Sequence, residues 1–202
     1  MPHAWRLLDM MEFGPAHPLT RGLLGNAHHE GLRVDGILQV TMGKQIDCVV
    51  VISPVAERMW KVSCSGEALL KACADFFVAV NVEGDGGPGS VITSTLSAAA
   101  AAASGGSFVR DRVVARDDAA RVLRTEVLEG GKVRNQLKFL VNEVKFEVAG
   151  DDACVAKFRV EYERIDGDGA LAPEDQSVIV EGYLGILKAI EAYLVANPSE
   201  YA

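Results

Sequence analysis

The chain has 202 residues, of which 49% are hydrophobic and 24% are charged, and its formal net charge is −8. A chain of this length and composition can bury a substantial core, and its simplest organisation is one compact domain with a tail. The negative charge repels phosphate groups, and no cluster of Lys and Arg offsets it. Binding to nucleic acid or to anionic membranes is therefore disfavoured.

Residues 1–40 differ from the rest of the chain. They contain all four histidines and many Gly and Pro residues, and their apolar residues follow neither the period of a strand nor that of a helix. We expect a poorly ordered N-terminal extension over residues 1–40 and a folded domain over residues 41–202. A metal site formed by His17, His28 and His29 is the alternative, but no acidic or cysteine ligands converge on these histidines.

The chain shows no pattern of export or membrane insertion. Its first residues lack a basic region followed by an uninterrupted apolar run, and no later segment reaches transmembrane length. The four cysteines, Cys48, Cys64, Cys73 and Cys154, are far apart without a C-x-x-C motif, which is typical of reduced, buried thiols. We expect a cytoplasmic or nuclear protein without a metal or cofactor.

A regular pattern of elements starts at residue 44. Residues 44–52 are typical of a strand, and Ser53 is the expected N-cap of a short helix with Pro54 in its first turn. A second short helix is expected from Gly66 to about Phe76.

Six further strands and a long helix complete the predicted elements. The connections between the strands are short and rich in Gly and Asp, as hairpins require. The helix is expected to open at Pro173 and to stop at Asn197 and Pro198. The expected strands are residues 78–83, 90–96, 107–115, 120–129, 137–148 and 153–164.

The glycine-rich stretch VEGDGGPGS contains the G-x-G-x-x-G spacing of a dinucleotide-binding turn. Such a turn must run from a strand into the N-terminus of a helix, whereas the β-branched residues after this stretch favour a strand. A Walker loop would need Lys before a Ser or Thr here, and Ser90 is followed by Val91. We expect a hairpin loop without bound nucleotide, formed by Gly84, Asp85, Gly86, Gly87, Pro88 and Gly89.

Alternation along the strands assigns polar residues to the inner face of the sheet. Asn142 lies in the inner register of residues 137–148, and a buried amide needs a partner, which is either structural or a ligand. Asp111 lies in the inner register of residues 107–115. It could act as a catalytic base, but a carboxylate held by a backbone amide or by Arg112 is the commoner arrangement, and we expect the structural role.

The C-terminal helix is apolar around most of its circumference in its first half, as expected if a curved sheet wraps around it. Gly182 and Gly185 lie inside this helix and leave volume unfilled. They favour a cavity between helix and sheet, although close packing of the helix on the sheet explains glycines equally well. The residues expected to line the cavity are Val109, Asp111, Val113, Leu123, Thr125, Asn142, Val144, Phe158, Val160, Val178, Gly182, Ile186 and Ile190.

Five stretches, VEGDGGPGS, FVRDRVVARD, VLEGG, NEVKFEV and KAIEAYLVANPSEYA, resemble in order and spacing the Bet v I family of plant pathogenesis-related class-ten proteins and pollen allergens. The resemblance covers roughly residues 44–202. It implies an α+β helix-grip fold of the START-like type, in which a curved seven-stranded antiparallel sheet surrounds a long C-terminal helix. Two short helices would close one end of a large hydrophobic cavity.

The resemblance also implies a function. Members bind small amphipathic plant metabolites, such as flavonoids, cytokinins, sterols or abscisic-acid-like hormones, in defence or stress responses. We expect a monomeric carrier or sensor, because an apolar pocket with few polar groups suits such ligands. A protein phosphatase is a partner at family level, but the gate and latch sequences S-G-L-P-A and H-R-L of the hormone receptors do not occur in this chain.

One enzymatic group, the norcoclaurine synthases, resembles this chain only in part. Those relatives use a tyrosine, a glutamate, a lysine and an aspartate facing the cavity. The matching positions here are Val109, Asp111, Leu123 and Asn142, so only the first carboxylate is kept. A metabolic enzyme using Asp111 is therefore the alternative to a non-enzymatic binding protein.

Ribonuclease activity is attributed to other class-ten relatives. It is associated with a lysine after the glycine loop, a mid-chain glutamate, and a glutamate and a tyrosine in the last helix. Glu191 and Tyr193 match, but Ile92 and Lys138 stand at the other two positions. This function is the least favoured for an acidic protein.

Overall fold

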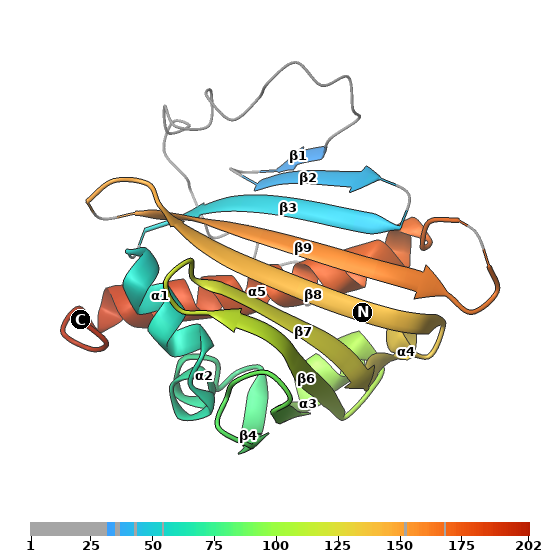
Figure 1. The fold of residues 1–202 in the computed structure, drawn as a ribbon, viewed down its shortest axis with the longest axis horizontal. Coiled ribbons are helices and arrows are strands. Elements are labelled where there is room, and N and C mark those ends of the chain that lie inside the picture. Colours follow the sequence, from blue (N-terminus) through green and yellow to red (C-terminus); the bar gives the residue numbers. More distant parts are fainter. Residues whose placement is uncertain (1–31, 35–36, 43, 54, 152, 168) are drawn as a thin grey trace.

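The computed structural model describes residues 32–202 except residues 35–36, 43, 54, 152 and 168. A single antiparallel sheet curves across the molecule, and the long helix α5 (Pro173–Ala196) lies along one of its faces (Figure 1). The short helices α1 (Ala56–Ser63) and α2 (Gly66–Ala72) contact each other and α5. This is the helix-grip arrangement that the resemblance implies.

The sheet has nine strands in the order β1-β2-β3-β9-β8-β7-β6-β5-β4. The strands from β3 to β9 are the seven expected ones, and their ends lie within two residues of the predicted ends. Alternating inward residues of these strands pack against α5. The strands are β1 (Leu32–Val34), β2 (Ile37–Met42), β3 (Gln45–Ile52), β4 (Phe77–Glu83), β5 (Val91–Leu96), β6 (Phe108–Asp117), β7 (Val122–Glu129), β8 (Leu137–Val148) and β9 (Cys154–Arg164).

Strands β1 and β2 were not predicted. β2 pairs with β3 from Ile37, opposite Val50, to Met42, opposite Gln45, so the expected boundary at residue 40 falls inside a strand. The sequence between β1 and β2 is Asp-Gly, which is a strong signal for a hairpin. The Gly and Pro content of residues 1–40 instead favoured a poorly ordered extension. Residues 1–31, with His17, His28 and His29, lie outside the described residues, and their predicted disorder stays a prediction.

The expected cap of α1 is wrong. The N-cap is Val55, which makes no side-chain capping hydrogen bond, and Pro54 lies outside the described residues. The backbone N–H of Ser53 instead donates to a carboxylate oxygen of Glu191 on α5, at 2.9 Å. This bond ties the segment before α1 to α5, and α1 begins without a side-chain cap.

Two helices that were not predicted occupy connections between strands. α3 (Ala98–Ser104) lies between β5 and β6, and α4 (Gly131–Arg134) lies between β7 and β8. α3 is a run of alanines, the residue with the highest helix propensity, and the side chain of Ser97 accepts a hydrogen bond from Ala100 N–H as its N-cap. α2 is also shorter than expected, because Cys73 is already its C-cap.

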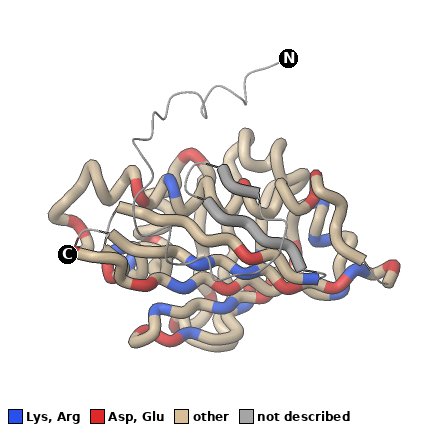
Figure 2. Tube along the Cα trace, turned by 90° about the horizontal axis from the view of Figure 1, so that it is seen from above, with Lys and Arg blue, Asp and Glu red and all other residues tan. Residues whose placement is uncertain are grey.

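The outer face of the sheet is covered by ion pairs. Arg124 on β7 pairs with Glu143 on β8 and Glu161 on β9, and Glu147 pairs with Lys145 and Lys157. Basic and acidic residues are interspersed along the chain (Figure 2). In the part of the chain that the structure describes, no helix is long and apolar enough to cross a membrane.

Candidate interior binding site

Three polar side chains lie in the interior between the sheet and α5. Asp111 comes from β6, Asn142 from β8 and Tyr183 from α5. β7 separates the two strands, and its residues Val127 and Thr125 are the register partners of Asp111 and Asn142. Neighbouring strands are about 4.8 Å apart, so roughly 10 Å separates the axes of β6 and β8. We call Asp111, Asn142 and Tyr183 the interior polar set.

Tyr183 connects the helix to the sheet. Its hydroxyl accepts a hydrogen bond from Nδ2 of Asn142, and its ring lies against the ring of Phe158, with 4.0 Å between the ring centroids. The buried Asn142 therefore has the structural partner that an inward amide needs. The sequence analysis missed Tyr183. Its helical spacing from the buried residues Val180 and Leu187 is the signal that could have found it.

Two oxygen atoms of this set have no partner. Oδ1 of Asp111 and Oδ1 of Asn142 are buried, and neither accepts a hydrogen bond from any described residue. Of the two expected partners of Asp111, a backbone amide or Arg112, the second is wrong, because Arg112 lies on the opposite face of β6 and forms an ion pair with Glu126. A buried acceptor without a donor costs about 1–3 kcal/mol, so the two atoms mark a site that a donor would complete.

Burial also changes the acid–base properties of the set. It raises the pKa of the Asp111 carboxyl from 3.8 to about 7, because a desolvated carboxylate is unfavourable. Burial first, and the nearby Asp111 second, raise the pKa of Tyr183 well above 10. Asp111 thus titrates near neutral pH, whereas Tyr183 keeps its proton.

The other sheet residues expected to line a cavity surround this set. Val113, Phe158 and Val160 are buried in the core. The remaining positions, Val109, Leu123, Thr125 and Val144, are half-buried. Their charged neighbours Arg110 and Arg124 form ion pairs, as the alternation of the strands predicted.

The helix residues expected at the cavity lie in different surroundings. Ile190 is buried, and Val178 and Ile186 are half-buried against the core. Gly182 is exposed, and no heavy atom lies within 4 Å of the position that a Cβ would take. A cavity-lining role for Gly182 stays a prediction, while its neighbour Tyr183 makes the contact with the sheet.

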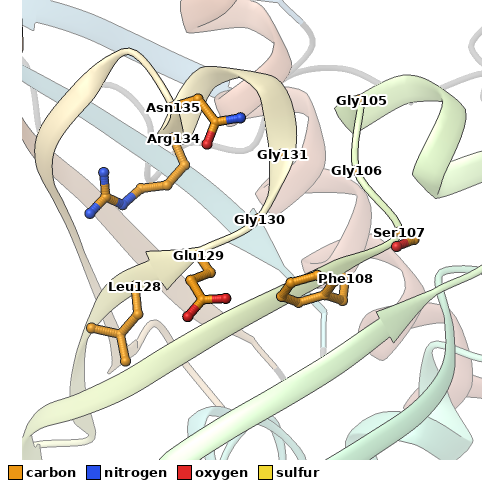
Figure 3. Close-up of a pocket in the computed structure, with 10 residues that line it drawn as sticks. All are labelled: Gly105, Gly106, Ser107, Phe108, Leu128, Glu129, Gly130, Gly131, Arg134 and Asn135. Carbon is orange, nitrogen blue, oxygen red and sulfur yellow. The ribbon is translucent and has the colours of Figure 1, made fainter.

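Two surface pockets lie away from the interior polar set. None of the residues expected to line the cavity borders either of them. One pocket, of about 400 Å³, lies between the segments that flank Gly106 and Gly130 (Figure 3). A Cβ on Gly130 would lie 2.2 Å from the carbonyl oxygen of Phe108, so the two segments touch at this glycine. The other pocket, of about 330 Å³, is lined by Glu57, Trp60, Lys61, Cys64, Ser65, Arg116 and Asp118.

The glycine-rich loop is the predicted hairpin. It joins the antiparallel pair β4 and β5, and Gly84, Gly86 and Gly89 have φ angles of 111°, 82° and 94°. The N–H of Gly86 donates to Ser90 Oγ, and that of Gly87 donates to a carboxylate oxygen of Asp85. These donors are already used, and a strand rather than a helix follows, so the geometry offers no phosphate cradle.

The described cysteines are thiols and not disulfides. Cys48, Cys73 and Cys154 are buried and Cys64 is half-buried. Burial raises the pKa of Cys48 to about 11 and that of each of the others to about 12, which suppresses thiolate chemistry. Among the described residues, no group of three or more His, Cys, Asp or Glu side chains could hold a metal ion.

The sequence profile of the pathogenesis-related protein Bet v 1 family matches residues 41–197, which include the sheet from β3 to β9, the interior polar set and α5. The chain belongs to the Bet v 1 family. The matched region starts inside β2, so β1 lies outside it.

Curated relatives in the Bet v 1 family are pollen allergens and pathogenesis-related proteins of plants. The major pollen allergen Aln g 1 of Alnus glutinosa is 30% identical over 74% of this chain and 92% of its own length. The pathogenesis-related protein STH-21 of Solanum tuberosum is 33% identical over 47% of this chain, and that match spans 61% of the relative's own length.

Solved structures share the fold at lower identity. Ara h 8.0201 has a TM-score of 0.64 at 22% identity, covering 77% of this chain and 100% of that chain. Norcoclaurine synthase from Thalictrum flavum, in complex with dopamine and hydroxybenzaldehyde, has a TM-score of 0.58 at 20% identity, covering 79% and 91%. Ginseng major latex-like protein 151 from Panax ginseng has a TM-score of 0.60 at 15% identity, covering 76% and 98%.

Proposed function

We propose that this protein binds a small hydrophobic or amphipathic plant metabolite between the sheet and α5, as a carrier or sensor in a defence or stress response. The observation that carries the proposal is the pair of unpartnered acceptors, Asp111 Oδ1 and Asn142 Oδ1, in an otherwise apolar interior. The membership in the Bet v 1 family and the pathogenesis-related relatives support the same function. Flavonoids, cytokinins and sterols have the expected combination of an apolar body and few polar groups.

The surroundings of the polar set suit an apolar ligand. Val113 on β6 and Phe158, whose ring lies against Tyr183, are buried, and Val109 and Val144 are half-buried. The proposal places the ligand in a gap along these apolar side chains.

The proposal includes a monomer in the cytoplasm or nucleus that binds neither nucleic acid nor membrane. The interspersed charges of the chain and its net charge of −8 support the absence of a phosphate-binding surface (Figure 2). Only the family resemblance supports a protein phosphatase as a partner.

A neutral fluorophore tests the binding site. N-phenyl-1-naphthylamine should bind the native protein at low micromolar concentration with increased emission, because an apolar gap of this kind favours a flat apolar ligand. Thr125→Trp should lower this affinity at least about tenfold without loss of folding, since the indole would occupy the gap. The control is Val114→Trp on the exposed face of β6, where Val114 is 43% exposed, and it should bind like the wild type.

A closely packed interior gives the opposite result. Trp at position 125 would then be overpacked and would destabilise the protein by about 1–3 kcal/mol. Destabilisation of this kind, together with no probe binding by the wild type, would sink the proposed function.

Catalysis through Asp111 is the second candidate. A buried carboxyl whose pKa is raised to about 7 has the property of a general base or acid at neutral pH. Val109, Leu123 and Asn142 stand at the other three positions of the norcoclaurine synthase set, so the lysine acid is missing. Turnover on a panel of phenolic amines with aldehydes, lost in Asp111→Asn, would favour this candidate over pure binding.

The ribonuclease residues have structural roles. Glu191 accepts the N–H of Ser53 and pairs with Lys188 at 2.7 Å. The hydroxyl of Tyr193 donates to Glu200. Both side chains therefore connect α5 to neighbouring parts of the chain, and no observation favours a ribonuclease.

A further inference from the structure

The unpartnered atoms of the interior polar set have one chemical property in common. Both Asp111 Oδ1 and Asn142 Oδ1 are hydrogen-bond acceptors. The third member, Tyr183, accepts the Asn142 amide through its hydroxyl oxygen and keeps its own proton. An incoming molecule therefore meets two unpartnered oxygen acceptors, one hydroxyl donor and, when Asp111 is ionised, the charge of a carboxylate.

The strands around this set bring no described cation into the interior. Arg110 and Arg112 lie in the outward register, where they pair with Glu129 and Glu126. Arg116, at the far end of β6, lies over the ring of Trp60 and pairs with Asp118. Arg124 on β7 also pairs on the outer face, and its inward neighbour is Leu123. No described Lys or Arg from β6 or β7 thus stands ready to neutralise an anion beside Asp111.

The half-buried Arg134 at the end of α4 is committed elsewhere. Its Nε donates to the carbonyl oxygen of Val127 at 2.6 Å, and its Nη1 donates to that of Leu137 at 2.5 Å. These bonds hold the guanidinium near the end of β7. There it lines the pocket between the segments around Gly106 and Gly130 (Figure 3).

We infer, on the basis of the proposed function, that the ligand donates hydrogen bonds to Asp111 and Asn142 and carries no negative charge. The class is an amphipathic molecule with a flat apolar body and a hydroxyl, N–H or ammonium head group. A carboxylate head would place two like charges in a desolvated interior without a counter-ion, which is strongly unfavourable. Acidic hormones of the abscisic-acid type are therefore disfavoured as ligands while Asp111 is ionised.

A head-group series with a constant body tests this inference on the full chain at pH 8, where the Asp111 carboxyl, with its pKa of about 7, is mostly ionised. The competitors are 2-(1-naphthyl)ethylamine, 2-(1-naphthyl)ethanol and 1-naphthylacetic acid, each displacing N-phenyl-1-naphthylamine. We expect the amine and the alcohol to bind at least about tenfold more tightly than the acid, because only they supply donors to the buried acceptors.

Two variants assign the selectivity to its cause. Asp111→Asn removes the buried charge and should reduce the preference for the amine over the acid to within about threefold. The matched control is Asp151→Asn, which removes an exposed carboxylate from the connection between β8 and β9 and should keep the wild-type preference.

The possible results separate this inference from the proposed function. If the wild type binds the fluorophore but binds the acid within about threefold of the amine, the charge selectivity is wrong and the binding function stands. An unchanged preference in Asp111→Asn also overturns the assignment. If the fluorophore does not bind the wild type at all, the binding function falls, and the inference falls with it.

Discussion

The position of Asp111 follows from the alternation of side chains along β6. Arg110 and Arg112 on either side of it point outward and find glutamate partners on β7. The same alternation turns Asp111 inward, opposite Val127, where the described chain offers no donor to its Oδ1 atom. A carboxyl in such a position makes folding depend on pH.

The first prediction concerns this pH dependence. The pKa of Asp111 is raised from 3.8 to about 7 in the folded protein, so the folded state favours the protonated form. The contribution of this group to stability is complete below pH 4, falls as the pH rises, and is lost above about pH 7. Asp111→Asn removes the titration. Its free energy of unfolding relative to wild type should therefore increase by about 2–3 kcal/mol between pH 5 and pH 8.

Urea unfolding of both proteins at the two pH values measures this difference. Asp151→Asn is again the control, because an exposed carboxylate should leave the difference nearly constant. If the free energies of unfolding of wild type and Asp111→Asn change by the same amount between the two pH values, the carboxyl is solvated in the folded protein.

At the scale of the element, α5 contains two glycines with different surroundings. Gly182 is exposed and has open space at its Cβ position. At Gly185 a Cβ would lie 2.8 Å from the Cζ atom of Phe76, so the ring would have to move. Only the second glycine is required by a close approach of another side chain.

The second prediction uses these glycines as a matched pair. Gly182→Ala should stabilise the protein by about 0.5–1 kcal/mol, because alanine has the higher helix propensity and meets no neighbour. Gly185→Ala gains the same propensity but displaces the Phe76 ring, so it should be neutral or destabilising. Thermal unfolding of both variants measures the difference. An equal gain at both positions would show that the Phe76 ring moves aside at no cost.

At the scale of the whole molecule, β1 and β2 extend the sheet beyond β3. Six residue pairs join β2 to β3, and without β2 the backbone groups along that edge of β3 would have no partner. An unpaired edge strand is a template for pairing with another chain. The two strands therefore protect one edge of the sheet that wraps around α5.

The third prediction compares two truncations. Removal of residues 1–31, which precede β1, should leave the melting temperature and the oligomeric state unchanged. Removal of residues 1–43 deletes both strands and should lower the stability by about 2 kcal/mol or more, with concentration-dependent association through β3. Thermal unfolding and sedimentation at several concentrations measure both effects. Equal behaviour of the two truncated proteins would contradict a protective role of β2.

The elements with their own periodic pattern could be predicted from the sequence. The strands from β3 to β9 alternate apolar and polar residues between Gly-rich and Asp-rich turns, and α5 opens at Pro173 and closes before Asn197. Each of these signals is local, because it depends on backbone geometry within a few residues. The inward positions of Asp111 and Asn142 follow from the same alternation.

Contacts between distant segments decided the remaining features. Ser53 lies two residues before the N-cap of α1, Val55, and its N–H bonds to Glu191, 138 residues further along the chain. Tyr183 joins the polar set because α5 packs across β8 and brings its hydroxyl to Asn142. Asp111 has no partner for its Oδ1 because alternation along β6 turns Arg112 outward to Glu126. Local pattern therefore determined which residues face inward, whereas only the packing of α5 on the sheet decided which of them find a partner.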